Sequence, residues 1–139
     1  MELRTVENTN HSSSVESGHR LGLELLSGDL PETAVFAASD AVALGVLQAA
    51  DELGVEVPRQ ISLMGFDNIE YASLPGIQLT TLSQNVPVLA RTAVRLVLEL
   101  LETQEQAVCT RKLVAPTLIE RSTCRALTPE EIVSGILKG

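Results

Sequence analysis

Hydrophobic and polar positions follow two different spacings along residues 33–64, and the changes between them predict the elements there. Thr33–Ala37 and Ile61–Met64 are short apolar runs of strand-forming residues, as buried strands are. Between them, Asp40–Leu53 has the 3.6-residue spacing of an amphipathic helix, and Gly54 provides its C-terminal stop. Two strands joined by a helix predict a parallel pair with a right-handed crossover.

The flanking segments predict further helices and strands. Ser13 and Glu16 fit a capping box that begins a helix reaching about Leu26 and stopping at Gly28. Gly18 and Gly22, four residues apart, predict close approach of this helix to a sheet rather than a phosphate-binding loop. The other predicted elements are a short edge strand (2–6), strands at Gln78–Leu82 and Lys112–Ile119, an amphipathic helix at Pro87–Thr103, and a helix start at 128–131 that continues to Ile136 and Leu137.

Polar residues follow both strands of the central unit where the strands end. In open α/β sheets, ligands bind beyond the carboxyl ends of the strands, and Ser39, Asp40, Phe66 and Asp67 all fall there. The carboxylate of Asp67 can accept hydrogen bonds from two adjacent sugar hydroxyls or from a base N–H, or it can cap its own loop. Ser39 is equally suited to cap the following helix, whereas Asp40 is expected to complement the helix dipole rather than to contact a ligand. Phe66 can offer its ring to a ligand or fill the core.

The helix at Asp40–Leu53 carries an apolar residue on its polar side. Leu44, with Ala41 nearby, falls within the arc of Gln48, Asp51 and Glu52. It is either an ordinary exposed leucine or part of a subunit contact. Apolar residues of the loop that follows Asp67 either pack inward or extend this patch; they include Leu74 and Pro75.

Composition indicates a globular chain and argues against direct binding of nucleic acid. The 139 residues are 45% hydrophobic and 20% charged, enough for one domain with a core of aliphatic side chains. The net charge is −8, and no basic face is apparent, whereas binding to nucleic acid depends on neutralising phosphates. No apolar run is long enough to span a bilayer, and the N-terminal residues lack the apolar core of a signal peptide.

Residue types that carry chemistry are present without the spacing that chemistry needs. Cys109 and Cys124 have no metal-ligand spacing and are expected to be free thiols in a reducing compartment. His11 and His19 lack acidic or cysteine partners at ligand spacing, so no metal site is expected. No Ser/His/Asp or Cys/His arrangement has a flanking signature, so neither an enzyme activity nor a cofactor is predicted.

The ordered set of these segments resembles a known family. The central run reads TAVFAASDAVALGVLQAADELGVEVPRQISLMGFDN, and it is followed by LTTLSQ (Leu79–Gln84) and LVAPTLIERST (Leu113–Thr123). Together they resemble the effector-binding core of the lactose-repressor/galactose-repressor family of bacterial transcription regulators, over most of residues 14–123. Two positions depart from the family pattern: Ser39 stands in place of the usual Asn, and Asn68 in place of a common Asp.

The resemblance implies a fold and a set of roles. The fold is α/β, a parallel sheet with helices on both sides, of the periplasmic-binding-protein-like type I. Asp67 and Ser39 match effector-contacting positions, Gln84 lies at a crossing between two lobes, and Val86 matches an apolar wall of the ligand site. Ser13 matches a position often held by an aromatic residue that stacks on the effector, and its hydroxyl here disfavours a planar or pyranose ligand.

The resulting interpretation is the effector-sensing part of a transcription regulator, for a sugar or nucleoside-like small molecule, in the cytoplasm. Residues 1–86 are expected to form a C-terminal lobe, 87–123 a crossover helix and returning strand, and 124–139 a tail with a short helix. Self-association into a dimer is implied, and operator DNA would be bound only through an N-terminal domain that this sequence lacks. The helix at Pro87–Thr103, without the family's other lobe, is expected to pack on this chain's own sheet, on the C-terminal helix or on a second copy. The alternatives are part of a transport-type sugar-binding protein or a small hydrolase or sugar-modifying enzyme.

Overall fold

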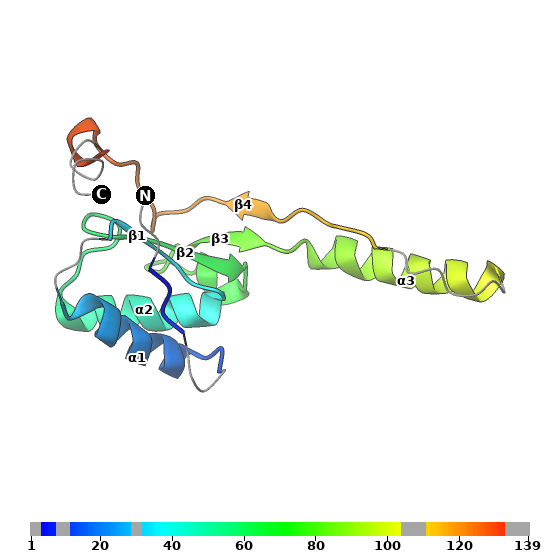
Figure 1. Ribbon diagram of the computed structural model, residues 1–139, viewed down its shortest axis with the longest axis horizontal. Coiled ribbons are helices and arrows are strands. Elements are labelled where there is room, and N and C mark those ends of the chain that lie inside the picture. Colours follow the sequence, from blue (N-terminus) through cyan, green and yellow to red (C-terminus); the bar gives the residue numbers. More distant parts are fainter. Residues whose placement is uncertain (1–3, 8–11, 29–31, 104–110, 133–139) are drawn as a thin grey trace.

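A computed structural model describes residues 4–7, 12–28, 32–103 and 111–132 (Figure 1). Its described part contains a four-stranded sheet with the order β1-β2-β3-β4. The first three strands are parallel neighbours, and the last is antiparallel to β3. Their bounds are β1 Ala34–Phe36, β2 Ser62–Asp67, β3 Thr80–Ser83 and β4 Thr117–Ile119. The predicted α/β class and the parallel pairing of β1 with β2 are confirmed.

Two helices cover one face of this sheet (Figure 1). Helix α2 (Asp40–Leu53) has the predicted bounds and ends at Gly54 in the left-handed conformation. Helix α1 (Val15–Leu26) packs on α2, and a short 3₁₀ helix, η1 (Glu70–Ser73), follows β2. The sequence predicts helices on both sides, and in the described residues α1 and α2 lie on the same side. Because β1, β2 and β3 lie side by side in chain order, right-handed connections fall on the same face.

Glycines allow α1 and α2 to touch backbone to backbone. A Cβ atom added at Gly45 would lie 2.1 Å from the carbonyl oxygen of Val15, and one at Gly18 would lie 2.2 Å from that of Val42. Both distances are far below van der Waals contact, so any side chain would push the helices apart. The predicted role of Gly18 in close packing is therefore correct in kind, but the partner is α2 rather than a sheet.

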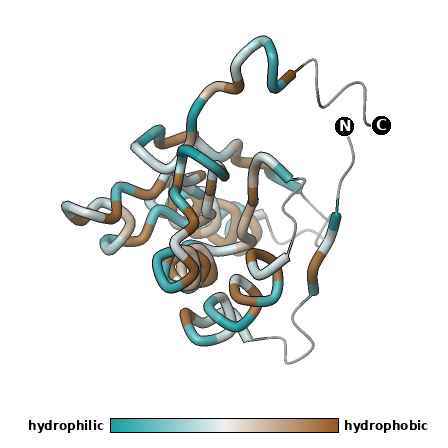
Figure 2. The backbone as a smooth tube through the Cα atoms, turned by 90° about the vertical axis from the view of Figure 1, so that its left-hand side faces the viewer, coloured by the Kyte–Doolittle hydropathy of each residue, from teal (hydrophilic) through white to brown (hydrophobic). Residues whose placement is uncertain are grey.

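The core lies between α2 and the strands and consists of small and aliphatic side chains. Figure 2 shows hydrophobic residues concentrated where the helices and strands meet. Fully buried members include Leu63, Leu79, Ala43 and Ala72. Together with the glycine contacts, this small-residue core brings helices and sheet close and fixes the edge where β1, β2 and β3 end.

Helix α3 (Val86–Thr103) projects away from this body (Figure 1). Residues 111–116 return beside it as an extended segment without strand pairing. Together they form an arm with exposed apolar side chains, since Val94 is 59% exposed, Leu101 72% and Leu113 82%. The predicted helix is present, but its packing on this chain's own sheet is not. The C-terminal helix offered as another partner lies mostly outside the described residues.

Several boundaries differ from the sequence predictions. The cap of α1 is Ser14 with Ser17, one residue later than Ser13 with Glu16, because both serine side chains bond to backbone N–H groups at the helix start. Strand β2 continues through Asp67, β4 begins only at Thr117, and residues 4–7 form no strand. Residues 129–132 are helical, as predicted. Within the described ranges, no helix is long and apolar enough to cross a membrane.

Candidate functional site

The carboxyl ends of the three parallel strands form one edge of the sheet. Asp67 pairs with Ser83, so β2 and β3 end together, whereas β1 ends where Phe36 pairs with Met64, three residues before the end of β2. Ser39 follows β1, Asp67 closes β2, and Gln84 follows β3. The candidate ligand residues therefore follow the carboxyl ends of three neighbouring strands, and they form two separate pairs.

Two serines from different segments are joined at this edge. The Oγ atoms of Ser13 and Ser39 lie 2.6 Å apart, although the residues are 26 positions apart in the sequence. Ser39 also accepts a hydrogen bond from the N–H of Val42 and so caps α2. Capping and the contact with Ser13 are therefore not exclusive. Ser39 is buried, whereas Ser13 is exposed, so the pair offers a hydroxyl to solvent from the Ser13 side.

Asp67 and Gln84 form a second pair. The Gln84 side-chain amide donates to Asp67 Oδ1 through Nε2, and both residues are half-buried. Asp67 has φ 119° and Asn68 has φ 58°, values that non-glycine residues seldom adopt. Such conformations persist where the surroundings hold them and are concentrated at functional sites. The end of β2 is thus a polar turn whose carboxylate is oriented by a neighbouring crossing segment.

Asp40 does not belong to the accessible part of the site. It is fully buried, and its carboxylate accepts hydrogen bonds from Thr81 Oγ1 at 2.6 Å and from the Ile69 N–H at 2.9 Å. The less favoured alternative, that Asp40 contacts an effector, is corrected by this burial. Its role is to tie α2 to β3 and to the loop after β2.

The two apolar site predictions fall in different surroundings. Phe66 is half-buried within β2. Val86 begins α3 and is 64% exposed, two residues beyond Gln84. Val86 therefore lies at the base of the arm, on the route by which the chain leaves the body.

A strap formed by residues 121–125 is the feature that the sequence analysis missed. The Thr123 Oγ1 accepts from the Thr80 N–H and donates to the Leu63 carbonyl, at 2.8 and 2.7 Å. The Arg121 guanidinium donates to the Leu79 carbonyl at 2.7 Å and to Asn68 Oδ1 at 2.8 Å. The strap therefore binds β2 and β3 together and reaches the turn that carries Asp67. The sequence ERST (Glu120–Thr123) could have indicated the strap, because its polar residues directly follow β4. Nothing in the neighbouring sequence, however, shows that these side chains point inward.

The strap continues into an ion pair near the start of β2. Arg125 donates to the Pro58 and Arg59 carbonyls and pairs with Glu131 at 2.6 Å. The hydrogen bond from Arg125 and that from the Thr128 N–H lower the pKa of the Glu131 carboxyl to about 2. This pair lies at the opposite end of β2 from Asp67.

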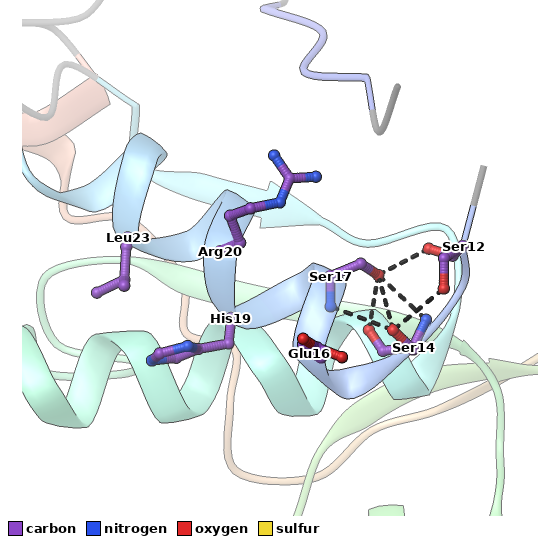
Figure 3. A pocket seen from close by; sticks show the side chains of 7 residues that line it. All are labelled: Ser12, Ser14, Glu16, Ser17, His19, Arg20 and Leu23. Carbon is purple, nitrogen blue, oxygen red and sulfur yellow. Dashed lines mark hydrogen bonds between the residues drawn. The ribbon is translucent and has the colours of Figure 1, made fainter. Parts of the chain in front are cut away.

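A hollow of about 560 Å³ lies along α1, and its lining includes Ser12 and Ser14, on either side of the candidate residue Ser13. All of its lining residues come from one segment, 12–23, and Figure 3 shows Ser12, Ser14 and Ser17 hydrogen-bonded to one another. His19 on the same helix contacts Glu52 of α2 at 2.8 Å. No group of three metal-ligating side chains occurs in the described ranges, and His11 and Cys109 lie outside them. The side chain of Cys124 is a free thiol against the Leu63 carbonyl.

The residues predicted for a dimer contact divide into two groups. Leu44 and Ala41 on α2 are half-buried. Leu74 is 40% exposed, and Pro75 is exposed beside Tyr71, which is 63% exposed. The loop after η1 is therefore the more accessible of the two surfaces.

Comparison with known proteins places these features in a family. Residues 2–124 match the periplasmic binding protein-like domain. Over 106 residues, the chain is 39% identical to the HTH-type transcriptional repressor PurR of Erwinia tasmaniensis and to that of Escherichia coli. Each match covers 76% of this chain and 31% of the repressor, so the chain spans about a third of the length of these curated relatives.

Solved structures agree with the sequence matches. The lac repressor dimer bound to operator and the anti-inducer ONPF is 34% identical, with a TM-score of 0.72 over 81% of this chain and 39% of that one. A LacI family regulator from Enterococcus faecium with bound ribose is 28% identical, with a TM-score of 0.71 over 83% of this chain and 42% of that one. These relatives are named as transcription regulators and not as enzymes, in line with the expectation of no enzyme activity. The chain belongs to the periplasmic binding protein-like domain family, and it is similar to part of the LacI-type regulators described above.

Proposed function

We propose that this chain forms one lobe of the effector-sensing domain of a bacterial transcription regulator, and that it binds a small polyhydroxylated molecule, a sugar or a nucleoside. The observation that carries the proposal is the placement of Ser13, Ser39, Asp67 and Gln84 at the carboxyl edge of the sheet. A carboxylate that accepts from an amide, together with a hydroxyl pair, offers hydrogen-bond acceptors and donors of the kind that sugar hydroxyls use. The ribose bound to the related regulator from Enterococcus faecium has chemistry of this kind.

The same proposal divides the chain into three segments. Residues 1–86 supply the C-terminal lobe, 87–123 the crossover helix and the returning strand, and 124–139 a tail with a short helix. Effector binding would favour one of two lobe arrangements and thereby change affinity for operator DNA, by an amount set by its differential affinity for the two states. By analogy with its relatives, the regulator would act in the cytoplasm.

The effector proposal is tested by NMR titration of this chain with D-ribose, other sugars and nucleosides. Shift changes are expected at the amides of Ser13, Ser39, Asp67 and Gln84, with dissociation constants in the millimolar range because one wall of the site is not supplied by these residues. Replacing Asp67 with Ala should weaken binding by about 1–3 kcal/mol through loss of a charged hydrogen bond. Asp51→Ala, on the exposed side of α2, is the matched control. A ligand-independent spectrum across the whole panel contradicts the proposal, and a micromolar constant contradicts the need for a second wall.

DNA recognition is assigned to a separate helix-turn-helix domain of the regulator and not to this chain. The net charge of −8 leaves little attraction for phosphates. A mobility-shift experiment with genomic fragments at near-physiological salt should therefore show no tight complex with this chain. A tight retained band is the contradicting result.

Self-association is proposed through the Leu44 face, with Ala41, Leu74 and Pro75 contributing. The accessible position of Leu74 and the half-burial of Leu44 leave both available to a partner. Leu44→Asp should lower the mass measured by sedimentation while the circular dichroism spectrum is retained. Arg91→Asp, which places the same acidic side chain at an exposed position of α3, away from Leu44 and Leu74, is the control. A wild-type chain that is monomeric at high concentration contradicts this contact.

A further inference from the structure

The turn after β2 is held from two sides by charged side chains that do not themselves reach the ligand edge. Asp40, fully buried on α2, accepts from the Ile69 N–H. Arg121, from the strap after β4, donates to Asn68 Oδ1 at 2.8 Å. Asp67 and Asn68 have φ 119° and 58°, and the two contacts hold Asn68 itself and the residue that follows it. Unfavoured backbone conformations need such support, because alone they would relax.

Arg121 is itself fixed by contacts that leave it little freedom. Its N–H donates to Thr80 Oγ1 at 3.0 Å, and its guanidinium donates to the Leu79 carbonyl at 2.7 Å. The side chain thus spans from the beginning of β3 to the turn beyond the end of β2. A planar guanidinium can bond two acceptors in one fixed geometry, which an ammonium cannot do.

We propose that Arg121, acting through Asn68, is a positioning residue that sets the direction of the Asp67 carboxylate and hence the affinity for the effector. The effector half of this inference rests on the function proposed above. The positioning half concerns the free chain alone. The proposal therefore predicts that the strap, which is remote in sequence from the site, changes the orientation of Asp67 through one side-chain contact.

The positioning half is tested without ligand. In Arg121→Met, which keeps the length of the side chain but removes its donors, the backbone shifts and three-bond couplings of Asp67 and Asn68 should change. Arg125→Met is the matched control, because Arg125 belongs to the same strap but contacts the Pro58 and Arg59 carbonyls at the other end of β2. An Arg121→Met spectrum that is unchanged at Asp67 and Asn68 overturns the proposal, whatever the chain binds.

The effector half is tested with D-ribose, or with the sugar or nucleoside that gives the largest shifts. Arg121→Met and Asn68→Ala should each weaken binding by about three- to tenfold, the loss expected for one ordinary hydrogen bond. Asn68→Asp keeps an acceptor for Arg121 and should retain wild-type affinity. In the Asp67→Ala background, Arg121→Met should add no further loss.

These outcomes separate a positioning role from a merely structural one. If Arg121→Met acted only by lowering stability, Arg125→Met would weaken binding as well. Asn68→Asp, which keeps the acceptor for Arg121, would then show no special retention of affinity compared with Asn68→Ala. Equal affinity of the wild type and Arg121→Met, or additive losses with Asp67→Ala, overturns the effector half. If the wild-type chain binds nothing in the panel, the proposed function fails, while the ligand-free spectra still decide the positioning half.

Discussion

The body and the arm of this chain are both rich in aliphatic side chains, which are buried in the body and exposed in the arm. In the body, Gly18 and Gly45 bring α1 and α2 into backbone contact, and Leu63 and Leu79 are buried. In the arm, α3 has the same amphipathic pattern, yet Leu101 is 72% exposed. Helical spacing is therefore enough to predict a helix, but it does not show which surface that helix will meet.

The largest effect is expected where the body is tightest. Gly45→Ala places a Cβ atom 2.1 Å from the Val15 carbonyl oxygen, so α1 and α2 must separate. Overpacking of this kind should cost about 2–3 kcal/mol of unfolding free energy, measured by urea denaturation. Gly28→Ala is the control, since an added Cβ there meets no atom within 4 Å. Equal stability of the two variants would mean that the helices are not in contact.

Two charged residues introduced into the arm should leave the free energy of unfolding nearly unchanged. Val94→Glu with Leu101→Glu alters side chains that are 59% and 72% exposed, so unfolding free energy should change by less than about 0.5 kcal/mol. Association at high concentration should fall, because exposed apolar faces promote it. Sedimentation and urea denaturation measure the two effects. Loss of fold in this variant would show that the arm packs on the body in solution.

Amide exchange compares the two helices directly. Most helical stability in proteins comes from packing of the apolar face, which α3 leaves exposed. Amides of Leu89–Leu101 should therefore exchange about a hundredfold faster than those of the buried side of α2. Adding a partner that covers α3 should slow amide exchange in the arm and leave exchange in the body unchanged. Comparable protection in the free chain at low concentration would show that a partner is already present.

The smallest effect concerns the strap and depends on pH. The pKa of Glu131 is lowered from an ordinary 4.5 to about 2. The stabilisation from its pairing with Arg125 should be complete above about pH 4.5 and lost as pH falls towards 2. The side chains are partly exposed, so the change should be local and salt-sensitive. Carboxyl shifts of Glu131 should report it, and Glu131→Gln should abolish it; a midpoint near 4.5 would contradict the pairing.

Sequence reasoning succeeded where local chemistry decides the structure. Helix α2 has both of its predicted bounds, because Ser39 and Gly54 carry cap signals that need no distant partner. It also placed Asp67 and Ser39 at strand ends. Sequence reasoning failed where a contact between distant residues decides the structure. The burial of Asp40 depends on its hydrogen bond with Thr81, and the role of Arg121 depends on its hydrogen bond with Asn68.

The attachment of the arm has a consequence for protein engineering. Ser83 of β3 and Thr117 of β4 lie directly opposite each other in an antiparallel pair, and Asn85 Nδ2 donates to Thr117 Oγ1 at 2.9 Å just beyond them. Topologically, β3 and β4 are a hairpin whose loop is the whole arm. A two-residue Asn-Gly turn would close the same ladder. The body is thus a candidate minimal domain, into which other sequences could be inserted between Ser83 and Thr117 without disturbing the sheet.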